Sequence, residues 1–319
     1  MSHARDSRRR RHRPRGSGSP PGQAGVGRAR VSGMTDLLPY RDDADDVEVP
    51  LLGGDVSDGV VRRGGTVRRP RGPHSPAVEA YLLHLERAGF ERAPRFLGID
   101  DDGREVVTFL PGEMGGRPPH AWATAEDVLV QLGEWQRALH EVSRDVVLPD
   151  GVAWRERPQF REVPDVFDEP DVVGHNDVTV ENALFVPAGD DPDGPHRLVG
   201  VIDFDLAGPT TRLLDVATTL LYWAPVAPPE ARPDVLRDLD APRRARVLTE
   251  AYGLDRSERL ALLDVLAQRF ARSWYAMRHA AQTRGGGWQR MWDDGVGDRI
   301  RENEAWFAAR RSDFVHALG

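Results

Sequence analysis

The hydrophobic pattern of the chain changes at Pro111 and Gly112, and this change constrains the fold more than any other feature. Before it, apolar residues occur in short β-type runs that Gly, Asp and Pro turns separate. One helical pattern, over residues 76–88, interrupts them after the third run. The five runs cover residues 47–52, 59–63, 66–69, 95–99 and 104–110. This order predicts a small lobe with an antiparallel sheet and one helix.

Helical periodicity dominates the rest of the chain. Over residues 128–142 apolar side chains recur at spacings of four and three, and Thr124 with Asp127 predicts the N-terminal cap of this helix. A capping box of Asp255 with Glu258 precedes another apolar stripe. Stripes of this kind are core faces, so they predict packed helices rather than cofactor sites.

A further helical pattern covers residues 299–317, and two short strand-like runs lie near residues 184–186 and 198–204. Together these patterns predict an α+β fold with two lobes. The N-terminal lobe is expected over residues 35–112, and the larger, mostly helical lobe over residues 113–319.

The first 34 residues are predicted to lie outside both lobes as a disordered tail. They contain nine Arg and one Asp with almost no large apolar side chain, so they cannot offset the entropy of folding. An organelle transit peptide and a start of translation at Met34 are alternative interpretations. Because the tail is basic, the rest of the chain is more acidic than the net charge of −8 indicates. An acidic body disfavours nucleic acid as a partner and favours cationic small molecules.

Three absences narrow the function classes further. No run of eighteen apolar residues occurs, so the sequence predicts no membrane span and no membrane partner. Cysteine is absent, which excludes disulfides, thiol catalysis and thiolate zinc sites and suits the reducing cytoplasm. Lysine is absent too, since all 43 basic residues counted as Lys or Arg are Arg, so the side chain that pairs with the phosphates of a nucleotide must be an arginine.

Two polar motifs accompany the strand-like runs of the helical lobe. The first is G-H-N-D-V-T-V-E-N over residues 174–182, and the second is V-I-D-F-D over residues 201–205. Phosphoryl transfer requires a carboxylate for the proton of the attacking hydroxyl and oxygen ligands that hold Mg²⁺ against the phosphates. Asp177, Asn182 and Asp203 supply these groups in the order of a kinase-like catalytic loop.

This pair of motifs resembles the pattern of the aminoglycoside phosphotransferase and choline kinase family, H-x-D-x-x-x-x-N followed by I-D-[WF]. The resemblance extends from about residue 45 to the C-terminus. It implies a two-lobed protein-kinase-like fold with ATP between the lobes. It further implies that Asp177 is the catalytic base, and that Asn182 and Asp203 bind Mg²⁺. His175 and Asp215 would then support the catalytic loop.

The first lobe carries the predicted nucleotide-binding residues. Gly53, Gly54 and Ser57 lie in a turn that either covers the phosphates with backbone N–H groups or is a plain hairpin turn. Strand alternation directs Arg68 and Arg69 to opposite faces, and Arg68 is chosen as the residue that contacts the phosphates.

The partner of Arg68 is expected on the helix that follows. Glu79, near the start of that helix, is the first choice, and Glu86, two turns later, is the second. Phe109 ends the strand lobe at the hinge where backbone groups would meet the adenine of ATP.

The sequence therefore predicts an ATP- and Mg²⁺-dependent phosphotransferase that acts on a hydroxyl of a small molecule. Aminoglycosides, choline and related amines or sugars are the expected acceptors. The alternative is a catalytically silent nucleotide-binding regulatory protein of the same fold. A protein or lipid kinase is disfavoured because neither H-R-D nor D-F-G occurs in the sequence.

Overall fold

The computed structural model of the chain describes residues 47–51, 59–163 and 169–319. The predicted phosphate-covering residues Gly53, Gly54 and Ser57 lie outside the described residues, as do the first 34 residues. What the sequence predicts for them stays a prediction.

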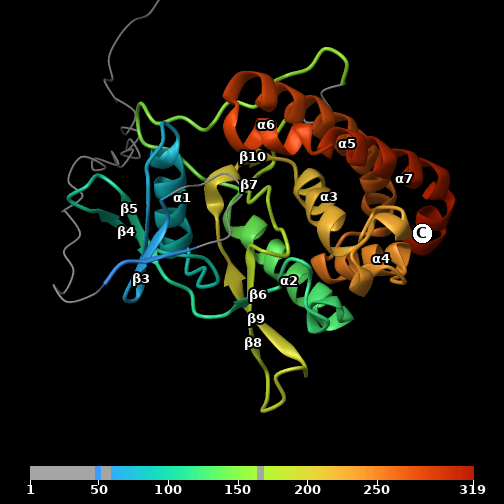
Figure 1. Cartoon of the computed structure of the whole chain (residues 1–319), viewed down its shortest axis with the longest axis horizontal. Helices are drawn as coiled ribbons and strands as arrows, with labels where there is room; N and C mark the ends of the chain where they lie inside the picture. The colour runs from blue at the N-terminus through green and yellow to red at the C-terminus, as the bar shows by residue number, and fades with distance from the viewer. Residues whose placement is uncertain (1–46, 52–58, 164–168) are drawn as a thin grey trace, which may run out of the picture. The chain divides into compact units, whose positions relative to one another are not determined.

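An antiparallel sheet and one helix form the first lobe (Figure 1). Helix α1 (Ser75–Arg87) carries Pro76 in its first turn, where a missing N–H breaks no helical hydrogen bond. Gly89 follows the helix with φ 74°, a left-handed conformation that glycine adopts without strain. In sheet order the strands are β1 (Val49–Pro50), β2 (Val61–Arg63), β3 (Thr66–Arg69), β5 (Glu105–Thr108) and β4 (Phe96–Ile99). The predicted order of three strands, one helix and two strands is confirmed.

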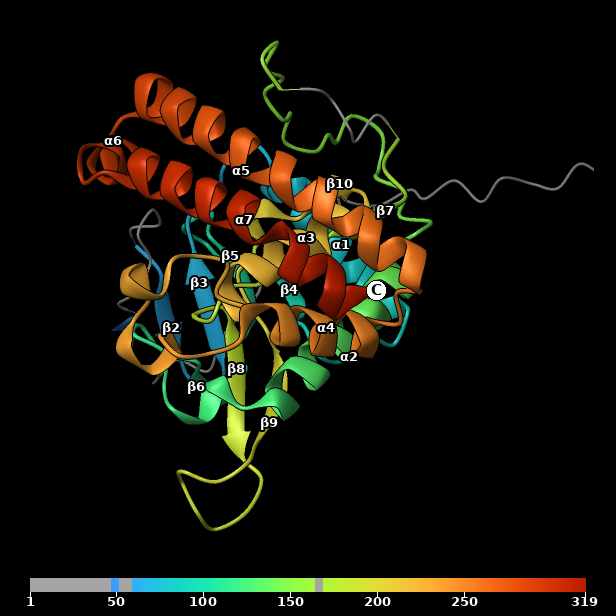
Figure 2. The same cartoon turned by 90° about the vertical axis from the view of Figure 1, so that its right-hand side faces the viewer.

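Helices make up most of the second lobe. They are α2 (Glu126–Val142), α3 (Arg212–Trp223), α4 (Ala241–Tyr252), α5 (Arg256–Arg284), α6 (Gly286–Asp293) and α7 (Val296–Leu318). Helices α5 and α7 lie side by side in both views (Figures 1 and 2). Among the helices of the described ranges, none is both long and apolar enough to cross a bilayer.

Two of the predicted helix caps can be compared with the structure. The capping box of α5 is present, because the Asp255 carboxylate accepts the Glu258 N–H while the Glu258 carboxylate accepts the Asp255 N–H. The predicted cap of α2 at Thr124 is wrong. Thr124 closes a short 3₁₀ turn (Trp122–Thr124), and its hydroxyl donates to the carbonyl of Ala121. Ala125 occupies the N-cap position of α2, and its side chain can make no capping hydrogen bond.

A shared hydrophobic core holds α1 of the first lobe against the second lobe. The hydroxyl of Tyr81 in α1 is fully buried, lies 2.7 Å from the Ser143 hydroxyl and donates to the Val173 carbonyl at 2.9 Å. Within the second lobe, α2 packs closely on α4 at Gly133, where a Cβ would lie 2.6 Å from the Leu248 carbonyl oxygen. The backbones therefore approach as closely as glycine permits.

Two small antiparallel sheets frame the polar motifs. Strand β7 (Val172–Gly174) pairs with β10 (Gly208–Thr210), and β8 (Ala183–Pro187) pairs with β9 (His196–Val201) and with β6 (Glu113–Met114). The first polar motif forms the loop from β7 to β8, and the second follows β9 directly. The two predicted strand-like runs thus correspond to β8 and β9.

Candidate active site

Strand pairing brings the two polar motifs together. Strands β8 and β9 place Ala183 opposite Val201, and one residue further the Ile202 N–H donates to the Asn182 carbonyl at 2.8 Å. Asp203 therefore comes one residue after Ile202, which is hydrogen-bonded to Asn182. Asn182 and Asp203, which are 21 positions apart in the sequence, thus belong to one site.

Asp177 and Asn182 are in direct contact. The amide nitrogen Nδ2 of Asn182 donates to the Asp177 carboxylate at 3.1 Å and to the Asp177 carbonyl at 2.9 Å. Burial, together with the negative charge of Asp203, raises the pKa of Asp177 to about 6. A fixed carboxylate whose pKa is raised toward neutrality has the properties of a general base.

The donor set beside Asp177 fits a magnesium ion. Because Nδ2 of Asn182 donates to Asp177, the side-chain amide oxygen of Asn182 faces away from this contact and can coordinate a metal ion. The Asp203 side chain is 45% exposed, on a residue with φ 64°. Within the part of the chain that the structure describes, no group of three or more His, Asp or Glu side chains is placed to hold a metal. Mg²⁺ typically uses one or two protein oxygens and completes its shell with phosphates and water, which matches this set.

We call residues 174–182 the catalytic loop after their predicted role, and the side chain of His175 lies buried beneath this loop. Its Nε2 is 3.0 Å from the Ile202 carbonyl, and its ring centroid is 4.5 Å from that of Phe204. Burial lowers the pKa of His175 to about 4, so the ring is neutral at pH 7 and Nε2 donates its hydrogen to the carbonyl. The ring thereby ties the first motif to the second.

Asp215, near the start of α3, holds the backbone of the same loop through hydrogen bonds. Its buried carboxylate accepts the N–H of His175 at 3.2 Å and that of Asn176 at 2.7 Å. Burial alone would raise the pKa of Asp215, but the hydrogen bond and charge of His140, with smaller contributions from Gln136 and His175, together outweigh burial and the pKa falls to about 2. Gly174 leaves room for this carboxylate, since a Cβ there would lie 2.8 Å from Asp215 Oδ2.

Sequence reasoning missed two residues that support the loop. His140 of α2 was counted in no motif, although its Nε2 lies 2.8 Å from Asp215 Oδ2. Asn176 has φ 64°, and its Nδ2 donates to the carbonyls of Leu206 and Gly208. The available signal was the residue type, because Asn enters the left-handed region more readily than most residues.

The structure corrects the choice between Arg68 and Arg69. Arg69 faces the aspartates of the second motif, with Nη1 at 2.7 Å from Asp205 Oδ1 and 3.4 Å from Asp203 Oδ1. Arg68 lies on the opposite, fully buried face, where it donates to the Thr66 hydroxyl. The predicted alternation is observed, but the choice of Arg68 as the residue that faces the phosphates is wrong because its face of β3 is the buried one.

The predicted partners of Arg68 have other contacts. The buried Glu79 pairs with Arg71 through two hydrogen bonds, at 2.5 and 2.9 Å. The partly exposed Glu86 lies 3.8 Å from Arg95. The pairing of Glu79 with Arg68 is therefore wrong, since Arg71 occupies both of its carboxylate oxygens.

Glu105 of the neighbouring strand β5 supports Arg69, and sequence reasoning missed it. The Arg69 Nε lies 2.5 Å from Glu105 Oε1. Burial raises the pKa of Glu105 to about 7 even though the Arg69 charge opposes the shift. The N–H of Phe109, just after β5, donates to the Gly65 carbonyl at 2.8 Å. This N–H therefore has its hydrogen-bond partner within the first lobe.

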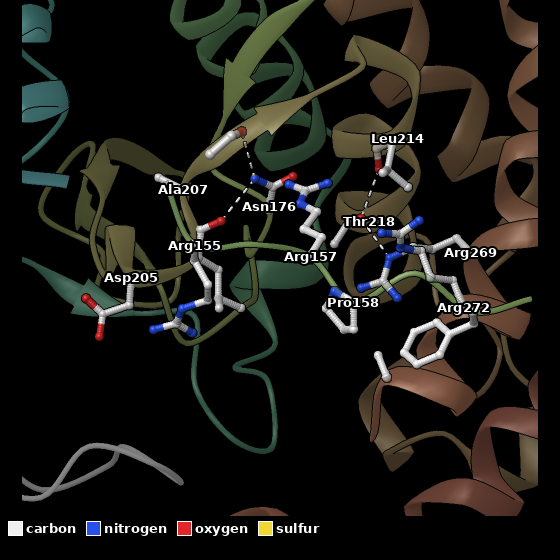
Figure 3. Close-up of a pocket in the computed structure, with 14 residues that line it drawn as sticks. Arg155, Arg157, Pro158, Asn176, Asp205, Ala207, Leu214, Thr218, Arg269 and Arg272 are labelled. Atoms are coloured by element: carbon white, nitrogen blue, oxygen red, sulfur yellow. Dashed lines mark hydrogen bonds between the residues drawn. The ribbon is translucent and has the colours of Figure 1, made fainter. Parts of the chain in front are cut away.

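A cavity of about 220 Å³ adjoins the catalytic loop (Figure 3). Four of its lining residues are arginines: Arg155, Arg157, Arg269 and Arg272. Asn176 and Asp205 bring the two polar motifs into its wall. We call this space the arginine cavity.

A second cavity, of about 310 Å³, is lined by both lobes. Arg69 and Arg71 contribute from the first lobe, and Arg155 and Asp205 from the second. Because Arg155 and Asp205 also line the arginine cavity, the two spaces share part of one wall.

Comparisons with known proteins agree with this geometry. The model of the phosphotransferase enzyme family matches residues 152–248, which include both polar motifs. The trifolitoxin immunity protein of Rhizobium leguminosarum bv. trifolii is 31% identical over 230 residues, covering 69% of this chain and 79% of that protein.

Two solved structures share the fold. Plasmodium vivax ethanolamine kinase has a TM-score of 0.52 and 11% identity, over 88% of this chain and 86% of that chain. A mutant of aminoglycoside 2′-phosphotransferase IIIa in complex with GDP has a TM-score of 0.51 and 14% identity, over 82% and 92%. The predicted two-lobed kinase-like fold is thereby confirmed.

Proposed function

This chain belongs to the phosphotransferase enzyme family, and on that premise we propose that it transfers the γ-phosphoryl group of ATP to a hydroxyl of a small molecule in the cytoplasm, with Mg²⁺ as the metal. The observation that carries the proposal is the contact of Asp177 with Asn182 directly beside Asp203. A base and two oxygen ligands at one point are what phosphoryl transfer requires.

The proposed step follows from the positions of these groups. The acceptor hydroxyl oxygen forms a bond to the γ-phosphorus, while the bond from that phosphorus to the bridging oxygen breaks and ADP leaves. The hydroxyl proton passes to Asp177, whose carboxylate is held by Asn182. Asn182 and Asp203 would hold Mg²⁺, which neutralises charge on the phosphates.

We assign the contact with the ATP phosphates to Arg69 in place of Arg68. Arg69 already lies within 3.4 Å of Asp203, and Glu105 holds its guanidinium from the adjacent strand. A guanidinium keeps its charge at any working pH and binds phosphate oxygens through two parallel donors.

Replacing Asp177 with Asn tests the function. We expect kcat to fall by roughly 10²- to 10⁴-fold, the usual contribution of a general base, while the KM for ATP changes little. The matched control is Asp264→Asn, an exposed carboxylate on α5 that pairs with Arg311. An Asp177→Asn variant with wild-type turnover would contradict the assignment. Binding of Mg·ATP by the wild-type chain without any turnover would favour the silent regulatory alternative.

The name of the 31% identical relative supports a second candidate function, immunity to a toxin. Expression of this chain in a trifolitoxin-sensitive strain, with growth measured against toxin dose, tests that candidate directly. Protection that is lost in Asp177→Asn would make phosphotransfer the means of immunity, whereas protection that persists would assign it to binding alone.

A further inference from the structure

We propose that the acceptor is a small hydroxyl compound with an anionic group, a carboxylate or a phosphate, which binds in the arginine cavity (Figure 3). This inference rests on the proposed phosphotransfer and names its substrate class. It replaces the cationic acceptor that the acidic composition of the chain predicts.

The arginine cavity lies at the catalytic loop. Asn176, which precedes Asp177, forms part of its wall. The positive charge of Arg269 acts on Asp177 strongly enough to oppose the rise of the Asp177 pKa. Arg269 is held in place because its Nε donates to the Thr218 hydroxyl at 3.0 Å. A molecule bound to Arg269 is therefore close to the proposed base.

Positive charge exceeds negative charge among the described residues that line this cavity. Among the described residues of its wall, four are arginines and one, Asp205, is a carboxylate. Asp205 already pairs with Arg69 at 2.7 Å. In the described part of the chain, no carboxylate lies within ion-pair distance of Arg155, Arg157 or Arg269. These charges are available to a bound anion.

Repulsion among the arginines can be seen at Arg157. Burial, and then the charge of Arg272, lower the pKa of Arg157 to about 10; the charge of Asp215 opposes this shift, and the charge of Arg269 adds to it. The guanidinium stays charged at pH 7, but in an environment that disfavours its charge. A half-buried guanidinium with no described carboxylate at ion-pair distance is unfavourable, and an anion bound between Arg157 and Arg269 lowers this penalty.

The wall of the cavity is fixed by packing on both sides. Trp154 packs edge-on against Tyr81 with ring centroids 5.9 Å apart, and Phe160 stacks on Tyr275 at 5.7 Å. These contacts hold the segment that carries Arg155 and Arg157 at its two ends. Arg269 and Arg272 are three residues apart on α5, so they share one face of that helix.

The volume and the shared wall define the acceptor further. About 220 Å³ is less than the roughly 300–1,000 Å³ of pockets for drug-sized ligands, so the acceptor is small. Arg155 and Asp205 separate it from the second cavity, where Arg69 faces the proposed phosphate site. An acceptor whose anion binds Arg157 and Arg269 therefore lies between the base and the donor phosphates.

Binding of inorganic phosphate to the nucleotide-free protein, measured by calorimetry, tests the anion site without turnover. We expect Arg157→Gln to weaken this binding at least tenfold. Arg278→Gln, an exposed arginine on α5 outside the cavity wall, is the matched control and should leave binding unchanged. Weakening by Arg69→Gln instead of Arg157→Gln would place the anion at the donor side and overturn the inference, as would the absence of phosphate binding.

Turnover of an acceptor panel separates this inference from the proposed function. The panel contains glycerate and glycerol 3-phosphate as anions, glycerol as the neutral match, and choline and an aminoglycoside as cations. We expect kcat/KM for an anionic acceptor to exceed that for glycerol at least tenfold, and Arg157→Gln to remove the difference mainly through KM. Turnover of neutral or cationic acceptors alone would overturn the anionic class and leave phosphotransfer standing. Phosphate binding through Arg157 with no ATP turnover would overturn the proposed function instead.

Discussion

Replacing Asp215 with Asn tests how the catalytic loop is held. The carboxylate is fully buried and accepts hydrogen bonds from His140 Nε2, from the His175 N–H and from the Asn176 N–H. An asparagine has the same shape but no charge, and its NH₂ group must face at least one of these donors. Hydrogen bonds to a buried charge contribute about 1.5–3 kcal/mol each, and breaking a buried charged contact costs about 3–5 kcal/mol. We expect a loss of about 3 kcal/mol in the free energy of unfolding at pH 7.

The pH dependence of this loss has a defined sign. The pKa of Asp215 falls from 3.8 to about 2 on folding, a difference that corresponds to about 2 kcal/mol. Because the folded-state pKa is the lower one, this stabilisation is present above pH 4 and disappears as the pH falls toward 2. The difference in stability between wild type and Asp215→Asn should therefore shrink by about 2 kcal/mol between pH 5 and pH 2.

Urea unfolding of both proteins across this pH range measures the difference. Asp264→Asn is the control, since that carboxylate is 72% exposed and pairs with Arg311 at the surface. Its loss should be at most about 1 kcal/mol. A loss below about 0.5 kcal/mol for Asp215→Asn at pH 7, within ordinary surface effects, would refute the reasoning.

Three further perturbations follow from the contacts. Arg69→Gln should raise the KM for ATP by about 10- to 100-fold, which is the equivalent of one charge-assisted contact. Arg68→Gln should instead lower the stability of the protein and leave the KM for ATP within about twofold of the wild-type value. Steady-state kinetics separates the two outcomes. Gly133→Ala should lower the free energy of unfolding by about 1–2 kcal/mol, because the clash with the Leu248 carbonyl exceeds the gain in helix propensity. Urea unfolding measures this loss. A variant more stable than the wild type would contradict the close packing of α2 on α4. Arg157→Gln should raise the Tm in phosphate-free buffer by ~2–4 °C, equivalent to about 1 kcal/mol of relieved repulsion, and an unchanged Tm would contradict that repulsion.

The grouping of Asp177, Asn182 and Asp203 was readable from the sequence because both motifs adjoin strands that pair locally. Asn182 ends the loop before β8, and Asp203 follows β9, so one antiparallel pairing brings them together. Asp177 lies five residues from Asn182 within the same loop. Few long-range contacts have to be known to assemble these three residues, and their site roles stay predictions that the kinetic tests address.

The orientation of β3 was not readable for a physical reason. Period-2 alternation says that Arg68 and Arg69 face opposite sides, but with charged residues in succession it does not say which side is buried. In the structure, Arg68 and Thr66 lie on the buried face of β3 and are hydrogen-bonded to each other. Glu105 was missed on the same ground, since a glutamate in a strand normally faces solvent.

The charge of the whole chain and the charge of the arginine cavity favour different acceptors, because binding depends on local charge. Arg157 and Arg269 are more than one hundred residues apart in the sequence, and the packing of Phe160 on Tyr275 and His279 of α5 helps to bring their segments together. Grouping half-buried arginines without carboxylate partners lowers stability, and a chain gains nothing in folding from it. A bound anion turns the same arrangement into affinity, because the charges are already fixed and need no reorganisation when the ligand arrives. The destabilising charge of the cavity and its proximity to Asp177 thus have one physical explanation, an anionic acceptor oriented for transfer.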